Sequence, residues 1–103
     1  MQKLLQKMIE KHNDSVLTSK FIENEITIIS ETLEMMRDSN EISNDAYLEL
    51  GSIQGGLSVI SSLILQNVEY AEISLLLNTL EERSILLEKK YQDLSNKFEE
   101  HRK

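Results

Sequence analysis

Few side chains in this sequence have the types and spacing that chemistry needs. His12 and His101 are the two histidines, and each is near only the carboxylates of its own segment. Neighbours two residues away on a helix face different directions, so neither histidine has the ligands of a closed zinc site. Cysteine is absent, which excludes disulfides and thiolate chemistry. We therefore predict solvated histidines and neither a metal ion nor an organic cofactor.

Carboxylate pairs also occur, and Glu31 with Glu34 or Glu81 with Glu82 have the residue types of an acid–base pair. Nothing beside them indicates a pocket that would separate their pKa values, and solvated helix faces carry such residues routinely. The stretch GSIQGG at 51–56 lacks the lysine of a phosphate-binding loop. The serines show no serine–histidine–carboxylate order. The sequence predicts no enzymatic activity and no small-molecule substrate.

The charge balance disfavours nucleic acid as a partner. The net charge is −7 at pH 7, whereas phosphate backbones are bound mainly by cationic side chains. Lys3, Lys7 and Lys11 share one face of a predicted N-terminal helix, a spacing typical of a solvated face. The acidic middle of the chain allows a different hypothesis, in which the protein inhibits a basic nucleic-acid-binding protein.

The segment from Leu50 to Val68 has no charged residue, although charged residues make up 28% of the chain. Serine, glutamine and asparagine interrupt it, and neither basic clusters nor aromatic residues mark its ends as they do in membrane spans. The N-terminus lacks the continuous apolar core of a signal peptide. We expect a cytoplasmic protein that does not enter a membrane.

Apolar residues recur at helical spacing along most of the chain, and proline is absent. Ser43 is a natural N-cap after a polar turn. The sequence predicts one all-α domain over 1–103, an antiparallel bundle of three long helices plus a short N-terminal helix. Its helices are predicted over approximately 2–12, 15–38, 44–66 and 69–101. A single bent helix in place of the first two is the alternative.

The last predicted helix is longer than its neighbours. At 1.5 Å per residue it reaches about 50 Å, against about 35 Å for each of the other two long helices. Its apolar seam continues through Tyr91, Leu94 and Phe98 with charges on the other faces, as at the end of a coiled coil. We expect these residues to overhang the bundle and to be buried by another chain.

The uncharged segment predicts two stripes on one helix. Leu50, Ile53, Leu57, Ile60 and Ile64 have the spacing of a core face. A second stripe contains only small residues, and its members are Gly51, Gly55, Ser58 and Ser62.

Small residues allow the backbone of another helix to approach closely. We expect this stripe to be a helix contact, more readily between chains than within one. The alternative is that Gly55 and Gly56 kink or end the helix.

These features predict a non-enzymatic protein that acts by protein–protein interaction. A helix without charge on any face is normally enclosed by protein, and a second copy of the chain is the simplest cover. The first hypothesis is a regulatory or inhibitory binding protein that works as a homodimer on another protein. The second is a structural or secretion-linked helical subunit or a chaperone.

Overall fold

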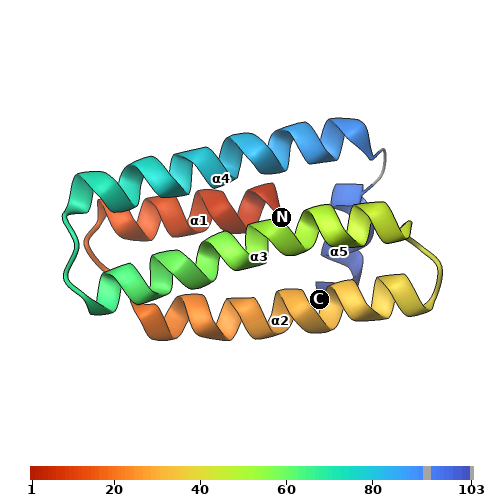
Figure 1. Ribbon diagram of the computed structural model, residues 1–103, viewed down its shortest axis with the longest axis horizontal. Coiled ribbons are helices and arrows are strands. Elements are labelled where there is room, and N and C mark those ends of the chain that lie inside the picture. The colour runs from red at the N-terminus through yellow and green to blue at the C-terminus, as the bar shows by residue number, and fades with distance from the viewer. Residues whose placement is uncertain (92–93, 103) are drawn as a thin grey trace.

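The computed structural model describes residues 1–91 and 94–102, and the described residues contain helices without strands. The all-α prediction is therefore confirmed. In Figure 1, α1 to α4 lie lengthwise beside one another and α5 crosses one end. The helices are α1 (Gln2–Asn13), α2 (Ser19–Asp38), α3 (Asn44–Leu65), α4 (Tyr70–Lys90) and α5 (Leu94–Arg102).

Side-chain caps set where two of the long helices begin. The Ser43 hydroxyl accepts a hydrogen bond from the Ala46 amide at 3.1 Å, which begins α3. The Thr18 hydroxyl accepts one from the Phe21 amide at 3.1 Å, which begins α2. The helix that we predicted from residue 15 therefore begins at Ser19, because Thr18 supplies the cap.

Three helices end on a non-glycine residue in the left-handed conformation. Ser15, Asn40 and Asn67 have φ values of 60°, 59° and 58°. After each one, the next amide bonds back to a carbonyl of the last helical turn, with N–O distances of 2.8 to 3.1 Å. This hydrogen bond satisfies a carbonyl that the helix leaves free. The turn at Ser15 makes α1 and α2 separate helices rather than one bent helix.

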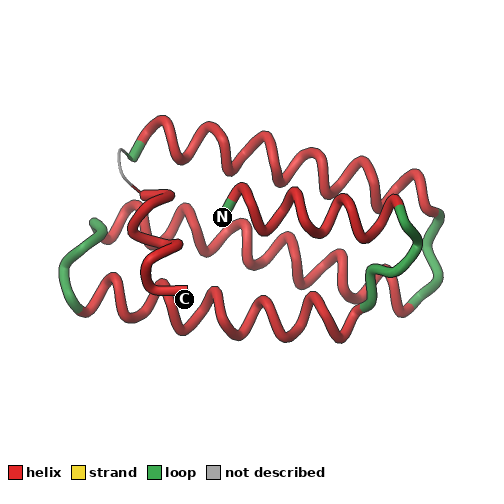
Figure 2. The backbone as a smooth tube through the Cα atoms, turned by 180° about the vertical axis from the view of Figure 1, so that it is seen from behind, coloured by secondary structure: helices red, strands yellow, loops and turns green. Residues whose placement is uncertain are grey.

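The core lies between the four lengthwise helices and is closed at one end by α5. Because α1 has 12 residues while α2, α3 and α4 have 20 to 22, α1 covers only part of their length. Figure 2 shows α5 crossing the bundle beyond the N-terminal end of α1. The most deeply buried apolar residues include Leu4, Leu5, Met8, Ile22, Ile29, Leu33, Met36, Leu50, Ile53, Leu57, Ile60, Leu77 and Phe98.

The predicted helix over 69–101 is wrong as a single element. Its first part ends at Tyr91, whose backbone is extended with φ −114° and ψ 96°, and α5 then packs against α2. Phe98 is only 1% exposed within its own chain, so it does not overhang. Burial in the core of its own chain removes its ring from water without a second chain. In the part of the chain that the structure describes, the separate helix α5 stands in place of the predicted coiled-coil-like end. The Leu94 side chain lies outside the described residues.

Candidate protein-interaction site

The helix α3 presents two faces with the same four-three spacing. On the inner face, Leu50, Ile53, Leu57 and Ile60 are at most 2% exposed and belong to the core. The opposite face points away from the core, and we call it the outer face of α3. It consists of Leu48, Gly51, Ser52, Gly55, Ser58, Val59, Ser62 and Leu65.

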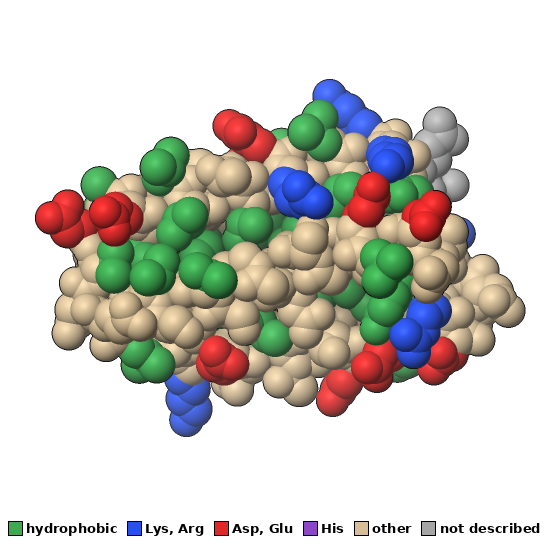
Figure 3. All heavy atoms as spheres, viewed as in Figure 1, with side chains coloured by type: hydrophobic (Ala, Val, Ile, Leu, Met, Phe, Trp, Pro, Cys, Tyr) green, Lys and Arg blue, Asp and Glu red, His purple; other side chains and the backbone are tan. Residues whose placement is uncertain are grey.

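The outer face is largely exposed and carries no charge. Leu48, Val59 and Leu65 are 62%, 55% and 73% exposed, which is high for side chains of this size. On the neighbouring α4, Leu75 and Leu86 are 67% and 66% exposed. Figure 3 shows hydrophobic side chains gathered along the middle of the side on which α3 lies. Exposed apolar side chains that gather on one side of a soluble protein are a feature of interaction sites.

The small-residue stripe is not a contact within the chain. A Cβ atom added at Gly51 or Gly55 would meet nothing within 4 Å, and Ser58 and Ser62 are exposed. The intrachain version of our prediction is therefore wrong, because the stripe points away from the other helices. Contact with a second chain stays a prediction.

The close approach between helices that we expected at Gly55 occurs instead at the adjacent Gly56. A Cβ there would lie 2.6 Å from Leu80 Cδ2, so α4 approaches α3 at this point. The helix continues unbroken from Asn44 to Leu65 through both glycines.

Polar side chains join α3 to α4 along one edge of the outer face. Lys90 Nζ donates to Glu49 Oε1 at 2.7 Å, and Arg83 Nε donates to the Ser52 hydroxyl at 2.9 Å. The hydrogen bond from Lys90 lowers the pKa of Glu49 and raises the pKa of Lys90. Tyr91 is half-buried against the core, and its pKa is raised chiefly by the Glu49 carboxylate. Tyr91 therefore belongs to the α3–α4 contact rather than to an overhang.

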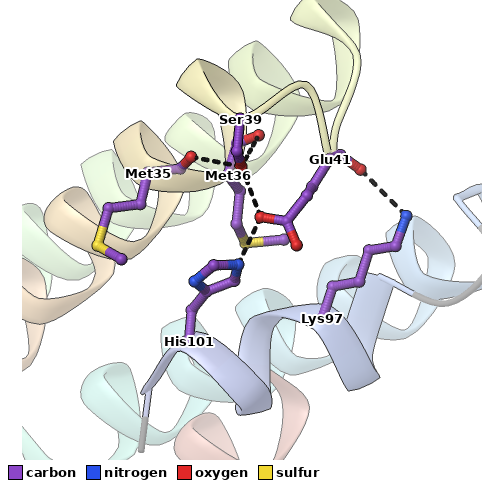
Figure 4. Close-up of polar contacts among 6 residues, drawn as sticks. All are labelled: Met35, Met36, Ser39, Glu41, Lys97 and His101. Atoms are coloured by element: carbon purple, nitrogen blue, oxygen red, sulfur yellow. Dashed lines mark hydrogen bonds and ion pairs between the residues drawn. The ribbon is translucent and has the colours of Figure 1, made fainter.

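The C-terminal helix is fastened to the turn between α2 and α3 (Figure 4). The Glu41 carboxylate accepts from the Ser39 hydroxyl at 2.6 Å and pairs with His101 Nε2 at 2.5 Å. Lys97 Nζ donates to the Glu41 carbonyl oxygen at 3.2 Å. The pKa of Glu41 is lowered, first by the Ser39 hydrogen bond and further by His101. Sequence reasoning missed these contacts because Glu41 and His101 are far apart in the chain.

At the other end of the bundle, His12 joins α1 to α4. Its ring stacks on Tyr70 with centroids 3.9 Å apart, and its Nε2 lies 3.0 Å from the Tyr70 carbonyl oxygen. The Tyr70 hydroxyl donates to Asn13 Oδ1 at 2.8 Å. A cavity of about 270 Å³ adjoins the pair. Our prediction that His12 is solvated is wrong, since only 9% of it is exposed.

Among the described helices, α3 has the length and composition of a membrane-spanning helix. It is long and apolar enough to cross a membrane, with 28% of its most apolar window buried in the fold. Core helices of soluble proteins meet the same criteria, so this finding is weak support for insertion.

Comparison of the chain with family models, with curated proteins and with solved structures gives no match. A function for this protein must therefore be inferred from the geometry of its described residues. Across residues 1–91 and 94–102, no group of three or more histidine, aspartate or glutamate residues is arranged to hold a metal ion. Both histidines make contacts that join helices or turns. Among the described residues, the outer face of α3 combines exposed apolar side chains with a stretch free of charge, and packing within one chain does not account for it.

Proposed function

We propose that this protein is an antiparallel helical bundle that acts by protein–protein contact, as a homodimer formed through the outer face of α3. In this proposal the dimer is a cytoplasmic regulatory or inhibitory binding protein. The single observation that carries the proposal is the uncharged and exposed outer face, which includes large apolar side chains.

Burial of this face has a sizeable driving force. Burying a fully exposed leucine or valine side chain is worth about 1.5–3 kcal/mol. Leu48, Val59 and Leu65 each expose more than half of their surface, and a symmetric interface would bury each of them twice. Part of this gain offsets the lost freedom of the two chains.

The outer face also lacks what would oppose its burial. Between Leu50 and Leu65 there is no charged side chain that would have to leave water. Its serine hydroxyls can bond to backbone carbonyls of their own helix, as Ser52 does with the Glu49 carbonyl at 2.6 Å. The stretch between Leu50 and Leu65 therefore brings no ionised side chain of its own into an interface, whereas Asp45, Glu49 and Lys90 adjoin Leu48 at the N-terminal end of the face.

The test is the mass of the protein in solution, measured by sedimentation equilibrium over a range of concentrations. We expect twice the 11.9 kDa of one chain. Val59→Glu should raise the dimer dissociation constant about 10-fold or more, because the interface would bury an unpaired carboxylate. Ile28→Glu is the matched control on α2, where the side chain is 38% exposed and outside the proposed interface. A wild-type protein that remains monomeric throughout would overturn the proposal.

A further inference from the structure

We infer that two copies of the chain exchange α5 when they fold together at high concentration, so that the C-terminal helix of each copy packs on the bundle of the other. This exchange is separate from the outer face of α3 and does not depend on the proposed homodimer. The fold itself shows what occupies the docking site, because α5 packs there against α2. A second copy brings the same helix with the same side chains.

The attachments of α5 are made with residues far from it in the chain. Lys97 Nζ donates to the Glu41 carbonyl oxygen, and His101 pairs with the Glu41 carboxylate, across 56 and 60 positions of sequence. Phe98 is 1% exposed and belongs to the hydrophobic core. These contacts do not depend on which copy supplies α5. Exchange therefore keeps them and buries the same apolar surface.

The end of α4 differs from the ends of α1, α2 and α3. Each of those three ends has a residue in the left-handed conformation, and the next amide bonds back to the last helical turn. After α4, Tyr91 has φ −114° and ψ 96°, and its amide makes the ordinary helical bond to the Leu87 carbonyl oxygen at 2.9 Å. Tyr91 therefore lacks the local cap that stops the other helices.

The sequence across this junction also favours a chain that continues in line with α4. Leu87, Tyr91, Leu94 and Phe98 keep the four-three apolar spacing, and neither glycine nor proline lies between Tyr91 and Phe98. The connection from α4 to α5 is only three residues long, from 91 to 93. Short connections of this kind favour exchange, because docking on a second copy removes the need to fold back.

Protein concentration decides between the two forms. Because the docked contacts of α5 are the same in both, the cost of exchange is the lost freedom of two separate chains. That cost falls as the concentration rises. We therefore expect exchanged pairs when chains refold together at high concentration, and α5 on its own bundle when they refold at low concentration.

Two single-cysteine variants of the full chain test the exchange, since the sequence has no cysteine. Glu41→Cys labels the docking site and His101→Cys labels α5, at two positions whose side chains pair in the fold. The variants are unfolded in urea, mixed and refolded together at high concentration, and a short bis-maleimide then joins neighbouring thiols. We expect a covalent heterodimer, because α5 of one chain then lies beside position 41 of the other.

Three controls assign this link to exchange. A chain with both substitutions, refolded at low concentration, should link within itself, which shows that α5 docks without the Glu41–His101 pair. The single variants folded separately and linked immediately after mixing should give about 10-fold less heterodimer, because α5 stays docked on its own bundle. Val59→Glu added to both single variants should leave the yield after refolding unchanged, since exchange does not use the outer face of α3.

The connection offers a further test of the cause. Insertion of Gly-Ser-Gly-Ser after Tyr91 should lower the heterodimer yield about 5-fold or more, since a longer flexible connection favours docking on the same chain. An unchanged yield would overturn the role given to the short connection.

Three other results would overturn the inference. The first is a co-refolded mixture without heterodimer although the chain with both substitutions links within itself. The second is an equal yield with and without unfolding, because the thiols would then meet through a contact between intact bundles. The third is a chain with both substitutions that does not link within itself, since α5 would then not dock beside Glu41. The proposed homodimer is tested separately, by the loss of yield or mass that Val59→Glu causes without unfolding.

Discussion

The inner and outer faces of α3 have the same spacing of side chains but opposite surroundings. Leu57 on the inner face is fully buried, whereas Leu48 on the outer face is 62% exposed. Gly56 touches Leu80 of α4, while its neighbour Gly55 touches nothing. Packing within the chain explains why the inner face is apolar. It does not explain the uncharged outer face, and this difference identifies the part of the helix that is available for a partner.

A comparison with α2 shows that an uncharged outer face is not required by the fold. The helix α2 has nearly the same length and packs directly against α3. Its solvent side carries Glu23, Glu31 and Glu34, which are exposed. A helix that meets only water is normally charged on that side, as α2 is. The outer face of α3 departs from this rule although it belongs to the same bundle.

The largest expected effect comes from one substitution made on each face. Leu57→Ala should reduce the free energy of unfolding by about 2–5 kcal/mol, because it leaves a cavity in the core. Leu48→Ala should change the stability of the monomer by about 0.5 kcal/mol or less, as surface substitutions do. Urea denaturation at low protein concentration measures both. Equal losses would show that the two faces are not distinct within one chain.

The second test uses the adjacent glycines. Gly56→Leu should cost about 1–3 kcal/mol of folding stability, because the new side chain overlaps Leu80. Gly55→Leu should instead stabilise the isolated chain by about 1 kcal/mol, since leucine is the better helix former and the position is open. The same Gly55→Leu change should weaken the proposed dimer, which sedimentation can detect separately. A stable and fully dimeric Gly55→Leu protein would exclude a close helix contact there.

Most of what the sequence predicted correctly about the fold came from the spacing of its apolar residues. The repeat of Leu50, Ile53, Leu57 and Ile60 placed α3 with its core face inward, and Ser43 marked where it begins. Such signals are local, because side chains three and four residues apart share one face of a helix. They therefore need no knowledge of the rest of the chain.

The features that the sequence did not show depend on distant partners. The apolar spacing continues through Tyr91 to Phe98 without a glycine or proline, so nothing local predicts that α4 ends at Lys90. The position of Phe98 depends on the shortness of α1, which leaves part of the core to cover. The burial of His12 likewise depends on Tyr70, which is 58 residues away. The sequence also predicted the stripe of small residues in the candidate site, but it did not predict that this stripe is exposed.

The smallest expected effect tests whether the α5 end is independent of the outer face of α3. The folded-state pKa of Glu41 lies below the 4.5 of an unperturbed carboxyl, because Ser39 and His101 stabilise its charged form. Its contribution to stability is therefore present above about pH 4.5 and is lost as the pH falls through the lowered value. Glu41→Gln lacks this contribution, so its melting temperature should be below that of the wild type at pH 7.

The two melting temperatures should converge as the pH falls below 4.5 and through the lowered pKa of Glu41, which thermal melts at successively lower pH would measure. Parallel curves would show that the carboxylate adds nothing to the attachment of α5. The outer face of α3 contains no titratable side chain between Leu50 and Leu65, so Glu41→Gln should leave the dimer mass at pH 7 unchanged. If that variant were monomeric at pH 7, the attachment of α5 and the outer face would be coupled. The availability of the outer face of α3 would then depend on the attachment of α5 at the end of the bundle.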